Sequence, residues 1–126
     1  MTPFGARMRE LRSDKAVTMK VMAEALHVSP AYLSALEHGK RGRPTVGLIH
    51  QICQYFGLIW DDAEALKRLA QISHPRIVID TAGLSPRATE LANVLSEKIR
   101  DLDDPRIEAM LAELTQLGGS DAGPKY

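Results

Sequence analysis

The residues of this chain with the clearest chemistry are cations that gather directly after a short predicted helix. Lys40, Arg41 and Arg43 lie close together in one loop, and Lys20 lies near the start of a second predicted helix. Lys and Arg side chains bind phosphate groups through charge-assisted hydrogen bonds. Contacts of this kind position a protein on nucleic acid without reading its sequence. We therefore expect these four cations to contact phosphates.

Other reactive side chains are few, and their spacing does not predict catalysis. The four histidines have no metal-ligand spacing with one another or with Cys53; they are His27, His38, His50 and His74. No Gly-rich phosphate loop or nucleophile arrangement is recognisable. Cys53 is the single cysteine, which excludes an intrachain disulfide, and we expect it to be a buried, inert thiol. The sequence predicts neither an enzyme nor a cofactor or metal.

The charged residues are distributed unevenly, although the whole chain has a formal net charge of zero. Residues 1–60 contain eight Lys and Arg against four Asp and Glu, a net charge of +4. Residues 61–126 contain eight against twelve, a net charge of −4. A basic first half and an acidic second half predict a domain that faces nucleic acid, joined to a region with another partner.

Two short predicted helices, joined by a tight turn, position these cations. Thr18 is a candidate N-cap of the first helix, and Ser29 followed by Pro30 is a strong start signal for the second. Only two residues separate Leu26 from Ser29, so the second helix must leave the first at a steep angle. The small side chain of Ala23 suits a close crossing. This geometry predicts a helix-turn-helix, which presents its second helix to the DNA major groove.

Three patterns occur in order along residues 4 to the mid-60s. They are RMRELR at residues 7–12, AxxLxVSPxYLSxLExGKR at residues 23–41, and FGL at residues 56–58. Together they resemble the Cro/repressor-type (XRE-type) helix-turn-helix family. The resemblance implies a five-helix DNA-binding domain, commonly dimeric, that regulates transcription. The family often has Gly where His27 stands, and His is among the few other residues that tolerate the left-handed backbone of that position.

The resemblance and the helical spacing together assign candidate site residues. If Leu33 and Leu36 face inward, the second helix offers these residues to the groove: Pro30, Ala31, Tyr32, Ser34 and Ala35. The expected phosphate contacts are Thr18, Lys20, Ser29, Lys40, Arg41 and Arg43. Arg12 and Glu37 match family positions that often form an ion pair, and we expect this pair to orient the second helix.

The rest of the sequence predicts helices, apart from one short strand, and the whole is expected to be an all-α protein. Helices are expected over residues 3–15, 45–55 and 61–72, which complete a five-helix domain over residues 1–74. Arg76–Asp80 is β-branched and predicts a short strand, which would need a partner from a second copy. Two amphipathic helices then follow, to about Arg100 and from Asp104, and residues 118–126 are expected to be disordered.

The strand and the two amphipathic helices lack partners within the chain, so residues 75–117 predict a dimerisation or interaction region. The expected interface comprises Ile77, Val78, Ile79, Leu91, Leu95, Ile99, Met110 and Leu114. No apolar run approaches the ~20 residues that span a membrane, and the N-terminus has no apolar signal core. We expect a cytoplasmic protein with double-stranded DNA and a second copy of itself as partners.

Two functions fit these features. The first is a homodimeric transcriptional regulator, a repressor by preference, that binds a pseudo-palindromic operator. The second is an antitoxin-like protein, whose acidic C-terminal half would cover a toxin while the helix-turn-helix provides autoregulation. The acidic half and its amphipathic helices leave both functions open.

Overall fold

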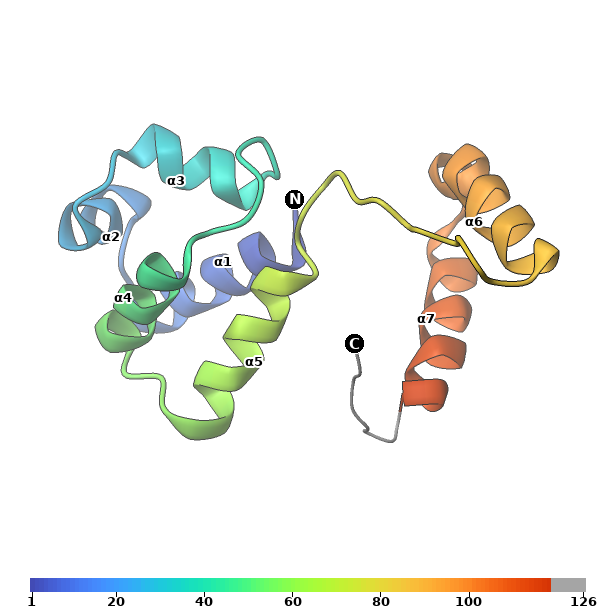
Figure 1. Ribbon diagram of the computed structural model, residues 1–126. Helices are drawn as coiled ribbons and strands as arrows, with labels where there is room; N and C mark the ends of the chain where they lie inside the picture. Colours follow the sequence, from blue (N-terminus) through green and yellow to red (C-terminus); the bar gives the residue numbers. More distant parts are fainter. Residues whose placement is uncertain (119–126) are drawn as a thin grey trace. The chain divides into compact units, whose positions relative to one another are not determined.

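The computed structural model describes residues 1–118, and within them the chain divides into two compact units (Figure 1). The N-terminal unit comprises residues 1–78. The C-terminal unit begins at Ile79, a few residues beyond the boundary that the sequence predicts. The described residues form seven α-helices and one short 3₁₀ helix, with no strand. The all-α prediction is confirmed, and the tail expected at 118–126 lies almost entirely outside the described residues.

Five helices build the N-terminal unit. They are α1 (Pro3–Lys15), α2 (Met19–Leu26), α3 (Pro30–Glu37), α4 (Val46–Phe56) and α5 (Trp60–Gln71). Four of them begin at a side-chain cap, in which a hydroxyl oxygen accepts a hydrogen bond from a backbone N–H of the first turn; the caps are Thr2, Thr18, Ser29 and Thr45. The helix starts are thus fixed locally by these hydroxyls.

The turn between α2 and α3 has the left-handed residue that the sequence predicts. His27 has φ 60° and ψ 40°, and the Val28 N–H donates to the Ala23 carbonyl over 3.0 Å. Ala23 is completely buried, so its methyl group leaves room for the two helices to cross closely. The helix-turn-helix geometry is therefore present.

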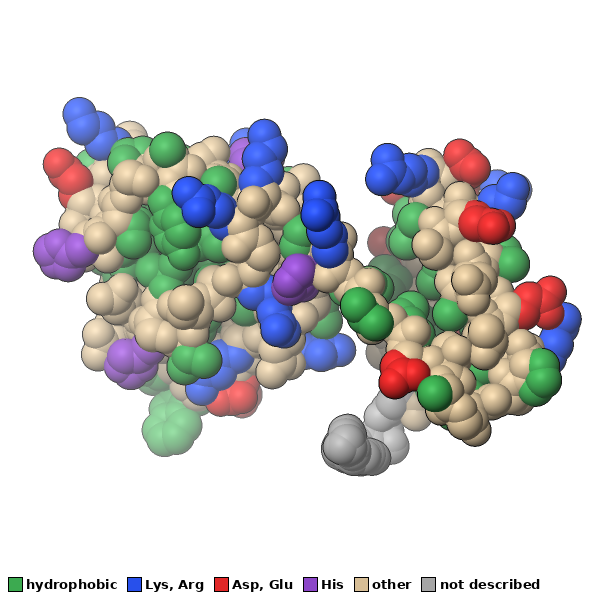
Figure 2. Space-filling view, turned by 45° about the horizontal axis from the view of Figure 1, so that its top comes forward, with side chains coloured by type: hydrophobic (Ala, Val, Ile, Leu, Met, Phe, Trp, Pro, Cys, Tyr) green, Lys and Arg blue, Asp and Glu red, His purple; other side chains and the backbone are tan. Residues whose placement is uncertain are grey.

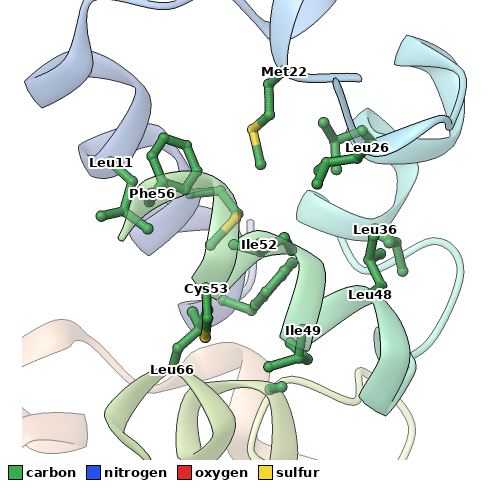
Figure 3. Close-up of a cluster of buried hydrophobic side chains, with 14 of the residues drawn as sticks. Leu11, Met22, Leu26, Leu36, Leu48, Ile49, Ile52, Cys53, Phe56 and Leu66 are labelled. Atoms are coloured by element: carbon green, nitrogen blue, oxygen red, sulfur yellow. The ribbon is translucent and has the colours of Figure 1, made fainter. Parts of the chain in front are cut away.

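The core of the N-terminal unit draws apolar side chains from all five helices (Figure 3). α4 lies at its centre and contributes Leu48, Ile49, Ile52, Cys53 and Phe56. The labelled side chains of α1, α2, α3 and α5 point toward it in Figure 3; they are Leu11, Met22, Leu26, Leu36 and Leu66. Because each of these helices buries one face against α4 or its neighbours, the short helices are stabilised mainly by tertiary packing.

The predicted strand Arg76–Asp80 is wrong. Residues 77–80 have no regular secondary structure, and Ile77, Val78 and Ile79 are 71%, 93% and 53% exposed. β-branched residues favour an extended backbone, but a strand also needs a neighbouring strand to pair its N–H and C=O groups. Nothing in residues 1–118 supplies that neighbour.

The C-terminal unit is a pair of helices joined by a short 3₁₀ turn. α6 (Pro86–Lys98) begins at the predicted cap Ser85, whose hydroxyl accepts from the Ala88 N–H over 3.2 Å. The turn η1 (Ile99–Asp101) leads to α7 (Asp104–Gly118). No residue of α6 or η1 is fully buried, so this unit has no core of its own comparable to that of the N-terminal unit.

A helix that crosses a lipid bilayer must be long and apolar. Within residues 1–118, none is both long enough and apolar enough to cross one.

Candidate nucleic-acid interface

The outer face of α3 is small and largely apolar, as the sequence predicts. Pro30 and Ala31 are exposed, whereas Tyr32, Ser34 and Ala35 are half-buried. Leu33 and Leu36 are buried and fix the rotation of the helix about its axis. The groove-facing candidates thus divide into an exposed N-terminal pair and three partly covered residues behind it.

The two caps of the helix-turn-helix are the hydroxyls predicted to lie near phosphate. Thr18 Oγ1 accepts from the Val21 N–H over 3.1 Å, and Ser29 Oγ accepts from the Tyr32 N–H over 3.0 Å. In each case the hydroxyl proton remains available as a donor, because capping uses only an oxygen lone pair. A helix N-terminus carries partial positive charge and favours an anion.

The basic loop, which we define as Lys40, Arg41 and Arg43, leaves α3 immediately after Gly39. All three side chains are exposed. The Arg41 guanidinium lies over the Tyr32 ring at 5.7 Å from its centroid, which ties the loop to the outer face of α3. Figure 2 shows hydrophobic side chains gathered on one face of the N-terminal unit, with Lys and Arg side chains at its margin.

The predicted residues Arg12 and Glu37 lie together, between α1 and the last turn of α3. Arg12 donates from both terminal nitrogens to the two carboxylate oxygens of Glu37, with Nη2 to Oε1 at 3.1 Å. The side chain of Glu37 is fully buried and that of Arg12 is 11% exposed. A carboxylate in this position would repel DNA phosphate if it faced outward, so the pairing turns its charge into the domain.

Further contacts that the sequence did not predict hold the same end of α3. The Thr2 N–H and hydroxyl both donate to the Glu37 carbonyl, at 3.0 and 3.2 Å. At Gly5 in α1, an added Cβ would lie 2.2 Å from that carbonyl oxygen, so only Gly permits the approach. A glycine inside a predicted helix is the sequence signal for such an approach, because it weakens the helix and needs a compensating reason.

Most of the predicted interface residues of the C-terminal unit are exposed apolar side chains, and together with their neighbours we call them the apolar surface of this unit. Leu91, Ile99, Met110 and Leu114 are between 46% and 68% exposed, and Leu95 is half-buried. Leu111 and Leu117 extend this surface along α7, at 55% and 78% exposed. Large exposed apolar side chains are typical of a surface that another molecule covers when they lie together in one patch.

The described residues include no reactive thiol and no metal-binding cluster. Burial raises the pKa of the Cys53 thiol above its ordinary value of 9.0, and the positive charge of Lys67 opposes this effect only in part. A buried thiol with a raised pKa has little reactive thiolate. Within residues 1–118, no three His, Cys, Asp or Glu side chains are arranged to hold a metal ion.

Two known regulators match part of this chain in sequence. The 57 residues that match the "HTH-type transcriptional regulator RamB" of Mycobacterium tuberculosis are 35% identical and cover 45% of this chain. A match of 52 residues to the "Uncharacterized HTH-type transcriptional regulator RghRB" of Bacillus subtilis is 38% identical and covers 41% of the chain. The chain spans only 12% and 37% of the lengths of these two relatives. No solved structure gives a significant match.

The family assignment rests on a longer match. The profile of the family described as "Helix-turn-helix domain" matches residues 3–67, slightly more than half of the chain. This range contains α1 to α4 and most of α5, including the two capped helices, the left-handed turn and the buried ion pair described above. The chain belongs to the helix-turn-helix domain family.

Proposed function

We propose that the protein is a transcriptional regulator that binds double-stranded DNA with α3 in the major groove. The observation that carries this proposal is the combination of a small-residue outer face on α3, exposed at Pro30 and Ala31, with an exposed basic loop directly after it. The relatives named as HTH-type transcriptional regulators support the same function.

Recognition on this surface would depend on shape and methyl groups more than on side-chain hydrogen bonds. Ala31 and Ala35 can contact thymine methyl groups, and Ser34 can donate or accept a hydrogen bond. Short side chains also allow the helix to approach the bases closely. Lys20 and the basic loop would bind phosphates on either side, together with the capped starts of α2 and α3.

We further propose that the regulator acts as a homodimer on a pseudo-palindromic operator and represses by occupying it. The apolar surface of α6 and α7 supports a dimer, because a second copy would cover Leu91, Met110 and Leu114. Two copies would then present two α3 helices to successive turns of the major groove, about 34 Å apart.

A substitution on α3 tests the DNA-binding proposal. Ala31→Glu places a carboxylate on the exposed face and leaves the core untouched, so operator binding should be lost while the thermal midpoint stays near that of the wild type. The operator would first be selected from random duplexes with the wild-type protein. Retained operator affinity in Ala31→Glu would mean that α3 does not face DNA.

The dimer has a separate test. Leu114→Arg adds a charge to the apolar surface of α7, and sedimentation should show the variant as a monomer under conditions in which the wild type is a dimer. A wild type that sediments as a monomer at micromolar concentration would contradict the dimer.

The antitoxin-like function remains the second candidate, because the same exposed surface on an acidic unit could cover a basic protein partner. It predicts that the purified chain alone is monomeric and prone to aggregation, and that a co-expressed partner restores a defined complex. A self-sufficient wild-type dimer would favour the regulator.

A further inference from the structure

A pocket of about 450 Å³ lies beside the basic loop in the N-terminal unit. Its lining comes from two segments that are distant in sequence, the loop after α3 and the residues after α5: Gly39, Lys40, Gly42, His74, Pro75 and Arg76. Lys40 and Arg76 carry positive charge, His74 can donate a hydrogen bond, and no lining residue is acidic. This composition suits an anion.

The segment that brings His74 and Arg76 to the pocket is anchored at Ser73 and at Pro75. Before it, Ser73 is 3% exposed, and its hydroxyl accepts from the Phe4 N–H over 2.9 Å and donates to the Leu69 carbonyl. Within it, Pro75 packs on the loop, since a Cβ added at Gly39 would lie 3.4 Å from the Pro75 Cβ. The backbone of residues 73–75 is thus held against the N-terminal unit before any ligand arrives.

The ring of His74 is oriented to donate. Its Nδ1 accepts from the Arg76 N–H over 3.1 Å, so in this arrangement the ring proton is carried by Nε2. Nε2 faces Gly42, where an added Cβ would lie 3.9 Å away, and Gly42 has φ +79°. A larger residue at position 42 would be strained and would narrow the pocket beside this nitrogen.

We propose that this pocket binds a phosphate of the DNA backbone, with His74 and Arg76 as contacts additional to the basic loop. The inference rests on the proposed DNA-binding function. Lys40 belongs to both the pocket and the basic loop, so a phosphate in the pocket would continue the row of contacts that follows α3. Each protomer would then contact the DNA backbone with residues from the loop after α3 and from the segment after α5.

Binding to a short fluorescent duplex, at a series of salt concentrations, tests this site in the full-length protein. Arg76→Ala and His74→Phe should each weaken binding about tenfold, on operator and mixed-sequence duplexes alike. For Arg76→Ala, the slope of log affinity against log salt should decrease by about 0.9 for each protomer bound. His74→Gln keeps a donor and should bind more tightly than His74→Phe.

Arg87→Ala is the matched control, because Arg87 is an exposed arginine of α6, paired with Glu90 and remote in sequence from the pocket. It should leave affinity and slope unchanged. Wild-type affinity and slope in Arg76→Ala would overturn the inference while the function stands. A wild type that binds no duplex would overturn both.

Free inorganic phosphate offers the same chemistry as a DNA phosphate, so it is titrated separately into the protein without DNA. Saturable shifts of the Gly42 and Arg76 amide resonances, combined with unchanged DNA binding in Arg76→Ala, would assign the pocket to a free anion and contradict the proposal. Reduced DNA binding in Arg76→Ala, with no saturable phosphate binding, would support it.

Discussion

The ion pair between Arg12 and Glu37 is a contact whose loss should strongly destabilise the N-terminal unit. Arg12→Met keeps the aliphatic part of the side chain but leaves the fully buried carboxylate of Glu37 without its cation. Breaking a buried pair from one side costs about 3–5 kcal/mol. Because small domains are typically stable by about 5–15 kcal/mol, this loss is a large fraction of the total.

The double variant separates the value of the pair from the cost of leaving one charge alone. Arg12→Met combined with Glu37→Met removes both charges, and such replacements by apolar residues are often neutral or stabilising by about 1–4 kcal/mol. We therefore expect the double variant to be more stable than either single variant. A thermodynamic cycle over the four proteins gives the coupling directly.

Urea unfolding followed by near-ultraviolet circular dichroism is the suitable assay, because it reports on the N-terminal unit. The sequence has six aromatic residues, and Tyr126 is the only one outside residues 1–78. The five within the N-terminal unit are Phe4, Tyr32, Tyr55, Phe56 and Trp60. A loss below about 1 kcal/mol in Arg12→Met would refute the reasoning, because it would mean that water or another group solvates the carboxylate. A double variant as unstable as the sum of the singles would refute it equally.

Three further predictions use other features of the same unit. Replacing the three basic-loop cations with Ala should weaken binding to operator and mixed-sequence DNA alike and reduce the salt slope by about one unit per lost contact; an unchanged slope would exclude the loop from the interface. Gly5→Ala should lower the free energy of unfolding in urea by roughly 1–3 kcal/mol, because the added Cβ would collide with the Glu37 carbonyl. Gly47→Ala has open space around the added Cβ and should raise the free energy of unfolding by about 0.5–1 kcal/mol. Burial raises the pKa of Cys53 in the folded protein, so the buried thiol stabilises the fold fully below its ordinary pKa of 9.0 and loses this contribution as pH rises above that value. The difference in unfolding free energy between wild type and Cys53→Ala should therefore narrow as pH rises above 9.0. A constant difference would contradict the burial effect.

The helix starts could be predicted from the sequence because their signals are local. Thr18, Ser29 and Ser85 each accept a bond from a backbone N–H three residues later, so the residue type and its neighbours determine the cap. His27 follows the same logic, since its left-handed backbone is a property of one residue in one turn. The helix-turn-helix could therefore be recognised without knowledge of tertiary structure.

The strand prediction failed because β-structure is not local. Ile77, Val78 and Ile79 favour an extended backbone, and residues 77–80 follow no regular secondary structure. Pairing would require a second segment, and neither residue type nor spacing shows whether one is present. The helices of the C-terminal unit were predictable, whereas residue type and spacing do not identify a partner for their exposed apolar side chains.

The contacts of Thr2 and Gly5 with the end of α3, and the pocket beside the basic loop, were not predictable for a different reason. Thr2 and Glu37, or Gly39 and Pro75, are separated by about 35 residues and meet only through the packing of α1 and α5 around the core. Polar contacts at such separations have no periodic signal in a single sequence. Gly5 alone offered a hint, since a glycine inside a helix has a cost.

The bracing of α3 has a consequence for how the protein could read DNA. α3 has eight residues, too few to be stable as an isolated helix, and its exposed face carries no long polar side chain. Methyl contacts with bases are short-ranged, because dispersion attraction falls steeply with a gap of less than one ångström. A recognition helix that relies on methyl contacts must therefore be held more rigidly than one whose long side chains can adjust to the bases. Thr2, Gly5 and Arg12 supply that rigidity from α1, so substitutions there should reduce operator affinity although none of these residues needs to touch DNA.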